Sequence, residues 1–290
     1  MEIPRKILTP VDFSPACAEA ARYAAEIARD FQAELTLLHV APPIAFEFAM
    51  TQPSSERYIE LAAHRSRTLR LAFEAFPAER PLPLAGLHRE LTEGDAAEEI
   101  LRRAHDGGYG LIVMPTRGHG ALRRLLAIGS VTSKVLHGAE CPVLAGTGFG
   151  EHYSPRLVRH VVAAVDFGPQ TAHVLRWGAG LARHYGAELT MIHAMPGAGS
   201  AHGEFFDPSW RATLCASLRE RLAALAEENG AEGDIAIEAG DAHKVVSGAA
   251  ERLKASVVVI GRGVSSDLLG RLRAQAYEII RRSPCPVLSV

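Results

Sequence analysis

The sequence has few cysteines and no feature of a membrane or secreted protein. Its four cysteines lie far apart and form no CxxC pair, which argues against a zinc knuckle and a disulfide framework. No apolar run approaches the roughly 20 residues of a membrane-spanning helix, and the first residues do not resemble a secretory signal. We therefore expect a cytoplasmic protein with reduced thiols and no membrane partner.

An excess of charge of one sign is also missing. The formal net charge is -2 over 290 residues, of which 22% are charged and 48% are hydrophobic. Without a basic excess we expect no nucleic-acid partner, and without an acidic excess we expect no disordered chain. The composition is that of an ordinary globular protein, and the length allows one large domain or two of typical size.

Common catalytic signatures are absent as well. The sequence contains no GxxxxGK[ST] loop of P-loop ATPases, no HExxH of zinc proteases and no GxSxG of α/β-hydrolases. We expect no metal site formed by the protein's own side chains. No residue stands at a spacing that predicts a general base, so we also name no catalytic residue.

What the sequence does contain is an internal repeat. The segment Ile7–Phe13 returns as Val161–Phe167, and Ala33–Val40 returns as Ala187–Ala194. Further landmarks recur in the same order: Gly94-Asp95 as Gly240-Asp241, Leu111–Met114 as Val257–Ile260, and Cys141–Leu144 as Cys285–Leu288. Matches in the same order indicate a duplication. We predict domains over residues 1–148 and 156–290, with a linker from Gly146 to Pro155.

Each repeat alternates short apolar segments with helical ones. The apolar runs are rich in Val, Ile and Leu with little alternation, which is typical of parallel strands covered on both faces. Ser14 and Pro15 suit the start of a helix, whose apolar face would include Ala20, Ala24, Ile27, Ala28 and Phe31. We predict an α/β fold with two tandem, doubly wound, open parallel sheets of five strands each. Residues 54–76 would add a helix to the first repeat.

Two elements at predicted strand ends suit ligand binding. Ligands of doubly wound sheets bind beyond the carboxyl ends of the strands, where Asp12 would lie. Its carboxylate could accept hydrogen bonds from a ribose or an exocyclic amine, or it could simply stabilise the following helix N-terminus. After the fourth strand come two glycine turns, which contain Gly118 and Gly129-Ser130. Glycines let backbone amides approach an anion, so these turns favour a phosphate cradle.

The order of these motifs resembles the universal stress protein family in its tandem form. The resemblance spans nearly the whole chain and rests on Pro10-Val11-Asp12, Gly94-Asp95, Thr116-Arg117-Gly118, Gly129-Ser130 and Cys141–Leu144. It implies a Rossmann-like fold of the adenine nucleotide alpha hydrolase-like type. It further implies ATP or a related adenine nucleotide as ligand, with or without Mg²⁺. In the family the last strands pair, so those beginning near Pro142 and Pro286 are expected to do so.

The resemblance also assigns site residues. Pro10, Val11, Asp12 and the backbone around Val40 would lie on the adenosine side. Around the phosphates would lie Met114, Pro115, Arg117, Gly118, Gly129, Ser130, Val131 and Thr132. Two departures stand out: Pro115 replaces the family's first glycine and removes an N–H, and ten residues rather than nine separate Gly118 from Gly129.

The second repeat departs further from the family pattern. Its degenerate site would comprise Asp166, Gly261, Gly263 and Arg273. There Arg273-Ala274 replaces Gly129-Ser130, so we expect this site to be empty, altered or filled by its own side chains.

The leading hypothesis is a stress-response regulatory protein that binds ATP or a related adenine nucleotide, mainly in the first repeat. The alternatives are a slow ATP hydrolase and an interaction protein that binds no nucleotide. Whether a protein partner or a homodimer is involved stays open. His39 and His193 are interpreted as core or strand-end histidines, and Cys141 and Cys285 as small buried residues.

Overall fold

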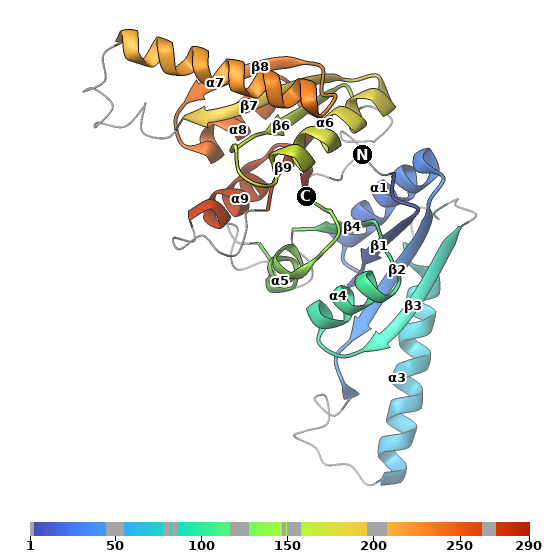
Figure 1. The fold of residues 1–290 in the computed structure, drawn as a ribbon. Helices are drawn as coiled ribbons and strands as arrows, with labels where there is room; N and C mark the ends of the chain where they lie inside the picture. Colours follow the sequence, from blue (N-terminus) through green and yellow to red (C-terminus); the bar gives the residue numbers. More distant parts are fainter. Residues whose placement is uncertain are drawn as a thin grey trace. The chain divides into compact units, whose positions relative to one another are not determined.

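The structure is a computed structural model that describes residues 3–44, 55–77, 82, 86–116, 128–146, 149, 158–195, 208–262 and 271–290. Backbone contacts divide the chain into two compact units. The N-terminal unit comprises mainly the described residues of Ile3–Leu125 and Gly129–Cys141, and the C-terminal unit mainly those of Pro142–Val290. Strands and helices alternate along the chain in both units (Figure 1).

The described part of the N-terminal unit contains a parallel sheet with the strand order β3-β2-β1-β4. The chain runs outward from β1 through β2 to β3 and then returns to the other side of β1. Strand order therefore reverses between β1 and β4, which is where a doubly wound sheet opens at its carboxyl edge. The strands are β1 Lys6–Pro10, β2 Glu34–Ala41, β3 Leu87–Glu93 and β4 Leu111–Pro115.

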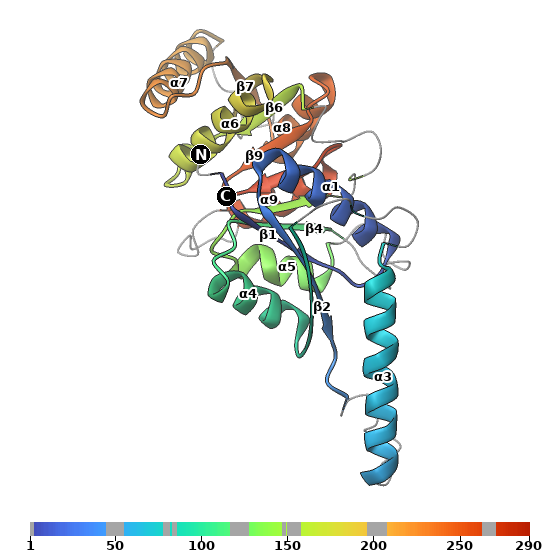
Figure 2. The same ribbon diagram turned by 90° about the vertical axis from the view of Figure 1, so that its right-hand side faces the viewer.

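Helices cover both faces of this sheet (Figure 2). On one side α1, Pro15–Phe31, packs against β1 and β4. On the other side α4, Ala96–Asp106, packs against β2 and β3, with α5, Ser130–Gly138, beside it. The helix predicted over residues 54–76 is α3, Ser55–Ala75, which contacts β3.

The start of α1 follows from its sequence. The Ser14 hydroxyl accepts a hydrogen bond from the Cys17 N–H at 3.2 Å, and Pro15 occupies the first turn, where a missing N–H is tolerated. Phe31, predicted on the buried face, is only half-buried. The rest of the predicted face is buried, with small side chains that let the helix lie close to the sheet: Ala20, Ala24, Ile27 and Ala28.

The described C-terminal unit has the strand order β5-β10-β9-β6-β7-β8. All neighbours are parallel except β5, which pairs antiparallel with β10, Leu144 opposite Leu288. The expected pairing of the last strands is thus confirmed. The strands are β5 Val143–Gly146, β6 His160–Ala164, β7 Glu188–Met195, β8 Asp234–Ala239, β9 Val257–Ile260 and β10 Val287–Ser289.

The helices of the C-terminal unit repeat the pattern of the first. α6 packs on β6, β7 and β9, whereas α8 and α9 pack against each other, and α8 also packs on β6 and β7. Together the two units confirm the predicted α/β fold class. The described strands divide into four and six rather than the predicted five and five, because β5 pairs with β10, and this one pair is antiparallel. None of the described helices is long and apolar enough to cross a membrane. The helices are α6 Thr171–Tyr185, α7 Pro208–Glu228, α8 Ala242–Arg252 and α9 Arg271–Arg282.

The predicted linker from Gly146 to Pro155 begins one residue too early, because β5 runs through Gly146. Apart from Gly146 and Phe149, the predicted linker lies outside the described residues.

Two glycines of the C-terminal unit provide a test of its packing. A Cβ on Gly233 would lie 2.3 Å from the Leu189 carbonyl oxygen, whereas a Cβ on Gly248, inside α8, would meet nothing within 4 Å. Gly233→Ala should destabilise the protein by about 1–3 kcal/mol through overpacking. Gly248→Ala should stabilise it by up to about 1 kcal/mol, because alanine favours the helix. Urea unfolding measures both, and shifts of the midpoint in the same direction would contradict this packing.

Candidate functional site

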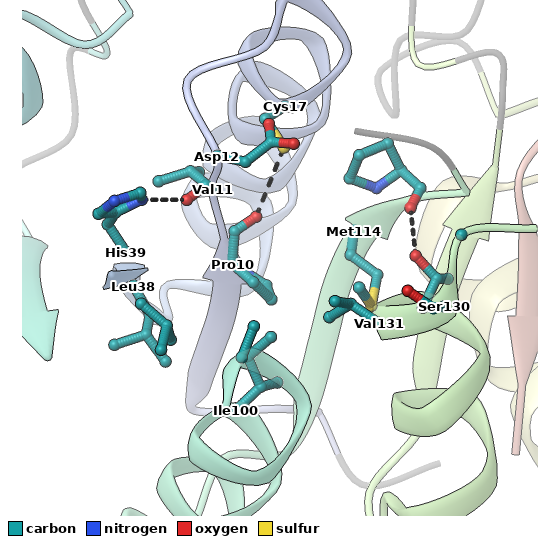
Figure 3. A pocket seen from close by; sticks show the side chains of 15 residues that line it. Pro10, Val11, Asp12, Cys17, Leu38, His39, Ile100, Met114, Ser130 and Val131 are labelled. Carbon is teal, nitrogen blue, oxygen red and sulfur yellow. Dashed lines mark hydrogen bonds between the residues drawn. The ribbon is translucent and has the colours of Figure 1, made fainter. Parts of the chain in front are cut away.

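A cavity of about 210 Å³ opens at the carboxyl edge of the N-terminal sheet, where strand order reverses (Figure 3). The ends of β1, β2 and β4 and the starts of α4 and α5 surround it. Its lining is apolar with a few polar groups. The residues are Pro10, Val11, Asp12, Cys17, Leu38, His39, Val40, Ala96, Ile100, Met114, Pro115, Gly129, Ser130, Val131 and Thr132.

Every described residue that the sequence assigned to the first site lines this one cavity. Residues far apart in the chain, such as Asp12, Val40 and Ser130, therefore meet as expected. Arg117, Gly118 and Gly263 lie outside the described residues, as does the side chain of Arg273. Sequence reasoning missed Cys17, Leu38, Ala96 and Ile100 and did not assign His39 to the site. The spacing of Ala96 and Ile100, four apart after the Gly94-Asp95 landmark, could have indicated that pair.

Asp12 follows β1 and is half-buried. Its Oδ1 accepts a hydrogen bond from the Ser14 N–H at 3.0 Å, so the carboxylate stabilises the turn before α1. It also lines the cavity. The two alternatives for this residue, a helix-start acid and a ligand-facing acid, are therefore compatible.

The N-terminus of α5 differs from those of its neighbours. Ser14 caps α1, and the Asp95 carboxylate caps α4 by accepting from the N–H groups of Ala97 and Glu98. No side chain of the described residues caps α5, which begins at Ser130. The first backbone bond into this helix is Ser133 N–H to the Gly129 carbonyl, at 2.9 Å. The N–H groups of Ser130, Val131 and Thr132 precede it, and all three residues line the cavity.

One expectation for this turn changes. The Gly129 N–H was expected to face an anion, but it donates to the Thr116 carbonyl at 2.8 Å. Thr132 Oγ1 donates to the Pro115 carbonyl at 3.1 Å. Both bonds fix the turn after β4, so the amides available to the cavity are those that follow Gly129.

The electrostatic character of the cavity comes from few groups. Its lining contains the Asp12 carboxylate at one end and no lysine or arginine among the described residues. At the other end, aligned peptide dipoles give the start of α5 a partial positive charge, roughly half an elementary charge at most. The cavity is therefore polar at both ends and apolar between them.

Beside Asp12, the imidazole of His39 contacts the end of β1. Its Nδ1 lies 2.8 Å from the Val11 carbonyl oxygen (Figure 3), so this nitrogen carries the proton and donates. The ring stacks on Phe13 with centroids 4.2 Å apart, and Phe13 adopts a left-handed backbone with φ 64°. Burial lowers the pKa of His39, which favours the neutral ring.

The C-terminal unit keeps the same strand-end arrangement. His193 Nδ1 lies 2.8 Å from the Val165 carbonyl oxygen, and Phe167 has φ 60°. Asp166 Oδ1 accepts from the Gly168 N–H at 2.8 Å. The Asp-Phe turn and the histidine are therefore common to both repeats.

Beyond this turn, glutamine side chains occupy the equivalent region of the C-terminal unit. Gln170, which replaces Ala16 of the first repeat, accepts at 2.7 Å from the Arg262 N–H, which also donates to the Val290 carbonyl at 3.1 Å. Its Cβ and amide oxygen also lie 3.2 and 3.3 Å from a Cβ position on Gly261. Gln275, which replaces Val131, accepts from the His243 N–H at 3.2 Å. These backbone amides are satisfied within the protein.

The described residues offer no group of three or more His, Cys, Asp or Glu side chains that could hold a metal ion. The cavity thiol is also unreactive by its surroundings. Burial, together with the negative charge of Asp12, raises the pKa of Cys17 to about 12. Burial likewise raises the pKa of Cys285 to about 11. A nucleophilic or redox cysteine needs a lowered pKa, so neither residue fits such a role.

The fold and the strand-end cavity define a tandem α/β protein with two Rossmann-like units. The model of the universal stress protein family matches residues 4–145 and 158–290. The chain belongs to this family, in a tandem arrangement.

Similar proteins agree with this assignment. A universal stress protein of Methanocaldococcus jannaschii is 34% identical over 140 residues, which cover 48% of this chain and 80% of the relative. A universal stress protein A homologue of Coxiella burnetii is 32% identical over 146 residues, 49% of this chain and 94% of the relative. The crystal structure of a universal stress protein from Archaeoglobus fulgidus shares the fold, with a TM-score of 0.66 and 23% identity. That match covers 98% of this chain and 95% of the other.

The raised pKa values predict that the thiols of Cys17 and Cys285 react slowly. At pH 8 a thiol with a pKa of about 12 is about 0.01% thiolate, so Cys17 should resist iodoacetamide in the native protein. Cys285 should also resist, whereas the half-buried Cys215 serves as reference. Mass spectrometry of labelled peptides measures the rates, with urea-unfolded protein as the control. Labelling of native Cys17 as fast as that of Cys215 would contradict the burial described above.

Proposed function

We propose that this protein is a cytoplasmic regulatory protein of the stress response that binds ATP or a related adenine nucleotide. Binding takes place in the N-terminal domain, residues 1–148, and the second domain, residues 156–290, holds none. The observation that carries the proposal is the uncapped start of α5, which lines the same cavity as the Asp12 carboxylate.

The start of α5 suits the phosphates. Unpaired N–H groups at a helix N-terminus, with the helix dipole behind them, form an anion site without any lysine or arginine. The hydroxyl of Ser130 stands at the same place and can donate to a phosphate oxygen. Mg²⁺, where present, would neutralise phosphate charge, since the described lining residues offer it only one carboxylate.

The other end of the cavity suits a nucleoside. The carboxylate of Asp12 accepts hydrogen bonds, and ribose hydroxyls donate them. Between Asp12 and α5 the walls are apolar, as a planar base requires. They consist of Leu38, Val40, Ile100, Met114 and Val131.

The size of the cavity limits what it encloses. Its volume of about 210 Å³ is smaller than the ~300–1,000 Å³ of typical pockets for drug-sized ligands. We therefore expect the described cavity to take the nucleoside and the first phosphate. The outer phosphates would extend beyond the described cavity.

These groups support binding rather than hydrolysis. Catalysis needs a base positioned for an attacking water. Asp12 is the one carboxylate among the described lining residues, and its Oδ1 already accepts from the Ser14 N–H. A regulatory role follows from a ligand that is held and not consumed.

Ser130→Glu tests the phosphate end. A carboxylate in the first turn of a helix is compatible with the dipole, so the fold should keep its stability. The same charge would repel phosphates, and ATP should bind about tenfold more weakly or worse. Ser130→Gln, of similar size but neutral, is the matched control and should lose much less affinity. Calorimetric titration measures binding, and equal affinities of the two variants would sink this placement of the phosphates.

Asp12→Asn and Asp166→Asn test which domain binds. Asparagine keeps an acceptor for the local turn but lowers the strength of a bond to ribose, so Asp12→Asn should weaken ATP binding about tenfold. Asp166→Asn should leave affinity unchanged, and the wild-type protein should bind one nucleotide per chain. Titration and mass spectrometry of small molecules released from purified protein give both results. Two nucleotides per chain, or a loss with Asp166→Asn, would overturn the assignment to the first domain.

A further inference from the structure

The ladder between β1 and β2 stops one rung earlier than the backbone would allow. Its last bond joins the Val11 N–H to the Leu38 carbonyl, at 2.9 Å. In a parallel ladder the next rung would join the Val40 N–H to the Val11 carbonyl. Instead, that carbonyl accepts from the Nδ1 of His39 at 2.8 Å. A side chain thus takes the place of the backbone rung.

The consequence for Val40 follows from the alternation of a strand. Leu38 faces β1, whereas Ala41 faces β3, where its carbonyl accepts from the Gly94 N–H at 3.0 Å. Val40, two residues after Leu38, therefore presents its N–H and carbonyl toward the β1 side. There His39 occupies the Val11 carbonyl, and Val40 lines the cavity. The strand end offers a donor next to an acceptor.

The histidine is held in place by its neighbours. Phe13 stacks on the imidazole at an interplanar angle of 29°, and the rings of Phe73 and Phe76 approach Phe13 edge-on at 5.8 and 5.7 Å. A left-handed backbone is unfavourable for phenylalanine, so it must be stabilised by its surroundings. The aromatic cluster therefore fixes the ring that holds the Val11 carbonyl.

The second repeat contains the same device away from the proposed nucleotide. The Val165 N–H donates to the Ile192 carbonyl at 2.8 Å, and the Val165 carbonyl in turn accepts from His193 Nδ1. His193 contacts Phe167, with ring centroids 4.5 Å apart. The chain therefore carries its own control for the effect of this histidine on the fold alone.

We infer that His39 is a positioning residue of the nucleotide site. By holding the Val11 carbonyl it keeps the N–H and carbonyl of Val40 available to a base that presents an acceptor beside a donor, as adenine does. This inference rests on the proposed function, in which the family resemblance already places the backbone around Val40 on the adenosine side. What it adds is the role of the imidazole, which keeps that edge open.

The first test needs no nucleotide. In the full-length protein, ¹⁵N NMR should show His39 protonated at Nδ1, and the Val40 amide should exchange with solvent quickly. In His39→Leu the Val11 carbonyl is free to accept the backbone rung, so exchange of the Val40 amide should slow about tenfold or more. His39→Asn should behave like the wild type, because its Nδ2 can donate from nearly the same position as Nδ1.

The second test separates the base from the phosphates. His39→Leu should lower the affinity for ATP at least about fivefold, as expected for lost hydrogen bonds. The affinity for inorganic tripolyphosphate should stay within about twofold of the wild-type value. His39→Asn should restore ATP affinity. His193→Leu removes the matching bond in the second repeat and should leave both affinities unchanged.

Equal losses for ATP and tripolyphosphate in His39→Leu would overturn the inference, as would a proton absent from Nδ1 or an unchanged exchange rate of Val40. If the wild-type protein binds neither ligand, the proposed function fails. The NMR and exchange measurements still decide in that case whether His39 keeps the Val40 edge open.

Discussion

The points at which parallel backbone ladders stop determine what this protein can bind. Every rung of a sheet satisfies one N–H and one carbonyl, and each group left over at a strand end needs another partner. In the N-terminal unit, β1 leaves the sheet after Val11 and β4 after Pro115. The Val11 carbonyl accepts a hydrogen bond from the His39 imidazole, and the Gly129 N–H donates to the Thr116 carbonyl. The groups that remain, at Val40 and at the start of α5, define the cavity.

Because the domain is duplicated, the backbone groups at the strand ends need partners in both units. At the end of β6 the turn, the carboxylate and the histidine are retained, so the strand-end geometry does not depend on a ligand. The described difference is that two glutamine side chains occupy the corresponding region of the second unit. Gln170 accepts from the Arg262 N–H, which also donates to the Val290 carbonyl, and Gln275 accepts from the His243 N–H at the start of α8. In the first unit alanine and valine stand at the two glutamine positions. This contrast supports the proposal that the first unit is the binding one.

Local patterns explain which features the sequence could predict. The strands follow from apolar runs, the start of α1 follows from Ser14-Pro15, and α3 follows from its helical pattern, because each signal lies within a few neighbouring residues. Two thirds of the cavity lining followed from the family resemblance together with the rule on strand ends, and the residues missed come from α1, β2 and α4. The pairing of β5 with β10 followed from the resemblance alone.

Other features depend on contacts across the fold. The Gly129 amide was expected to face the cavity, but which carbonyl it meets depends on how the chain after β4 returns to Thr116. His39 was interpreted as a core or strand-end histidine, and it does lie at a strand end. Its contact with Val11 depends on the register between two strands. The bond from Arg262 to Gln170 joins residues 92 positions apart, which no local pattern reveals.

The start of α5, which lines the cavity without a side-chain cap, affects the stability of the ligand-free protein. With Gly129 at the N-cap position, the missing side-chain cap lowers stability by only a few tenths of a kcal/mol, but α5 is too short to be stable alone. Two side-chain hydrogen bonds hold the helix in place. The Thr132 hydroxyl donates to the Pro115 carbonyl, and Lys134 Nζ donates at 3.3 Å to Asp95, which also caps α4. The anchoring thus lies outside the N–H groups that face the cavity. An anion bound there would stabilise only the folded state, because the site does not exist in the unfolded chain.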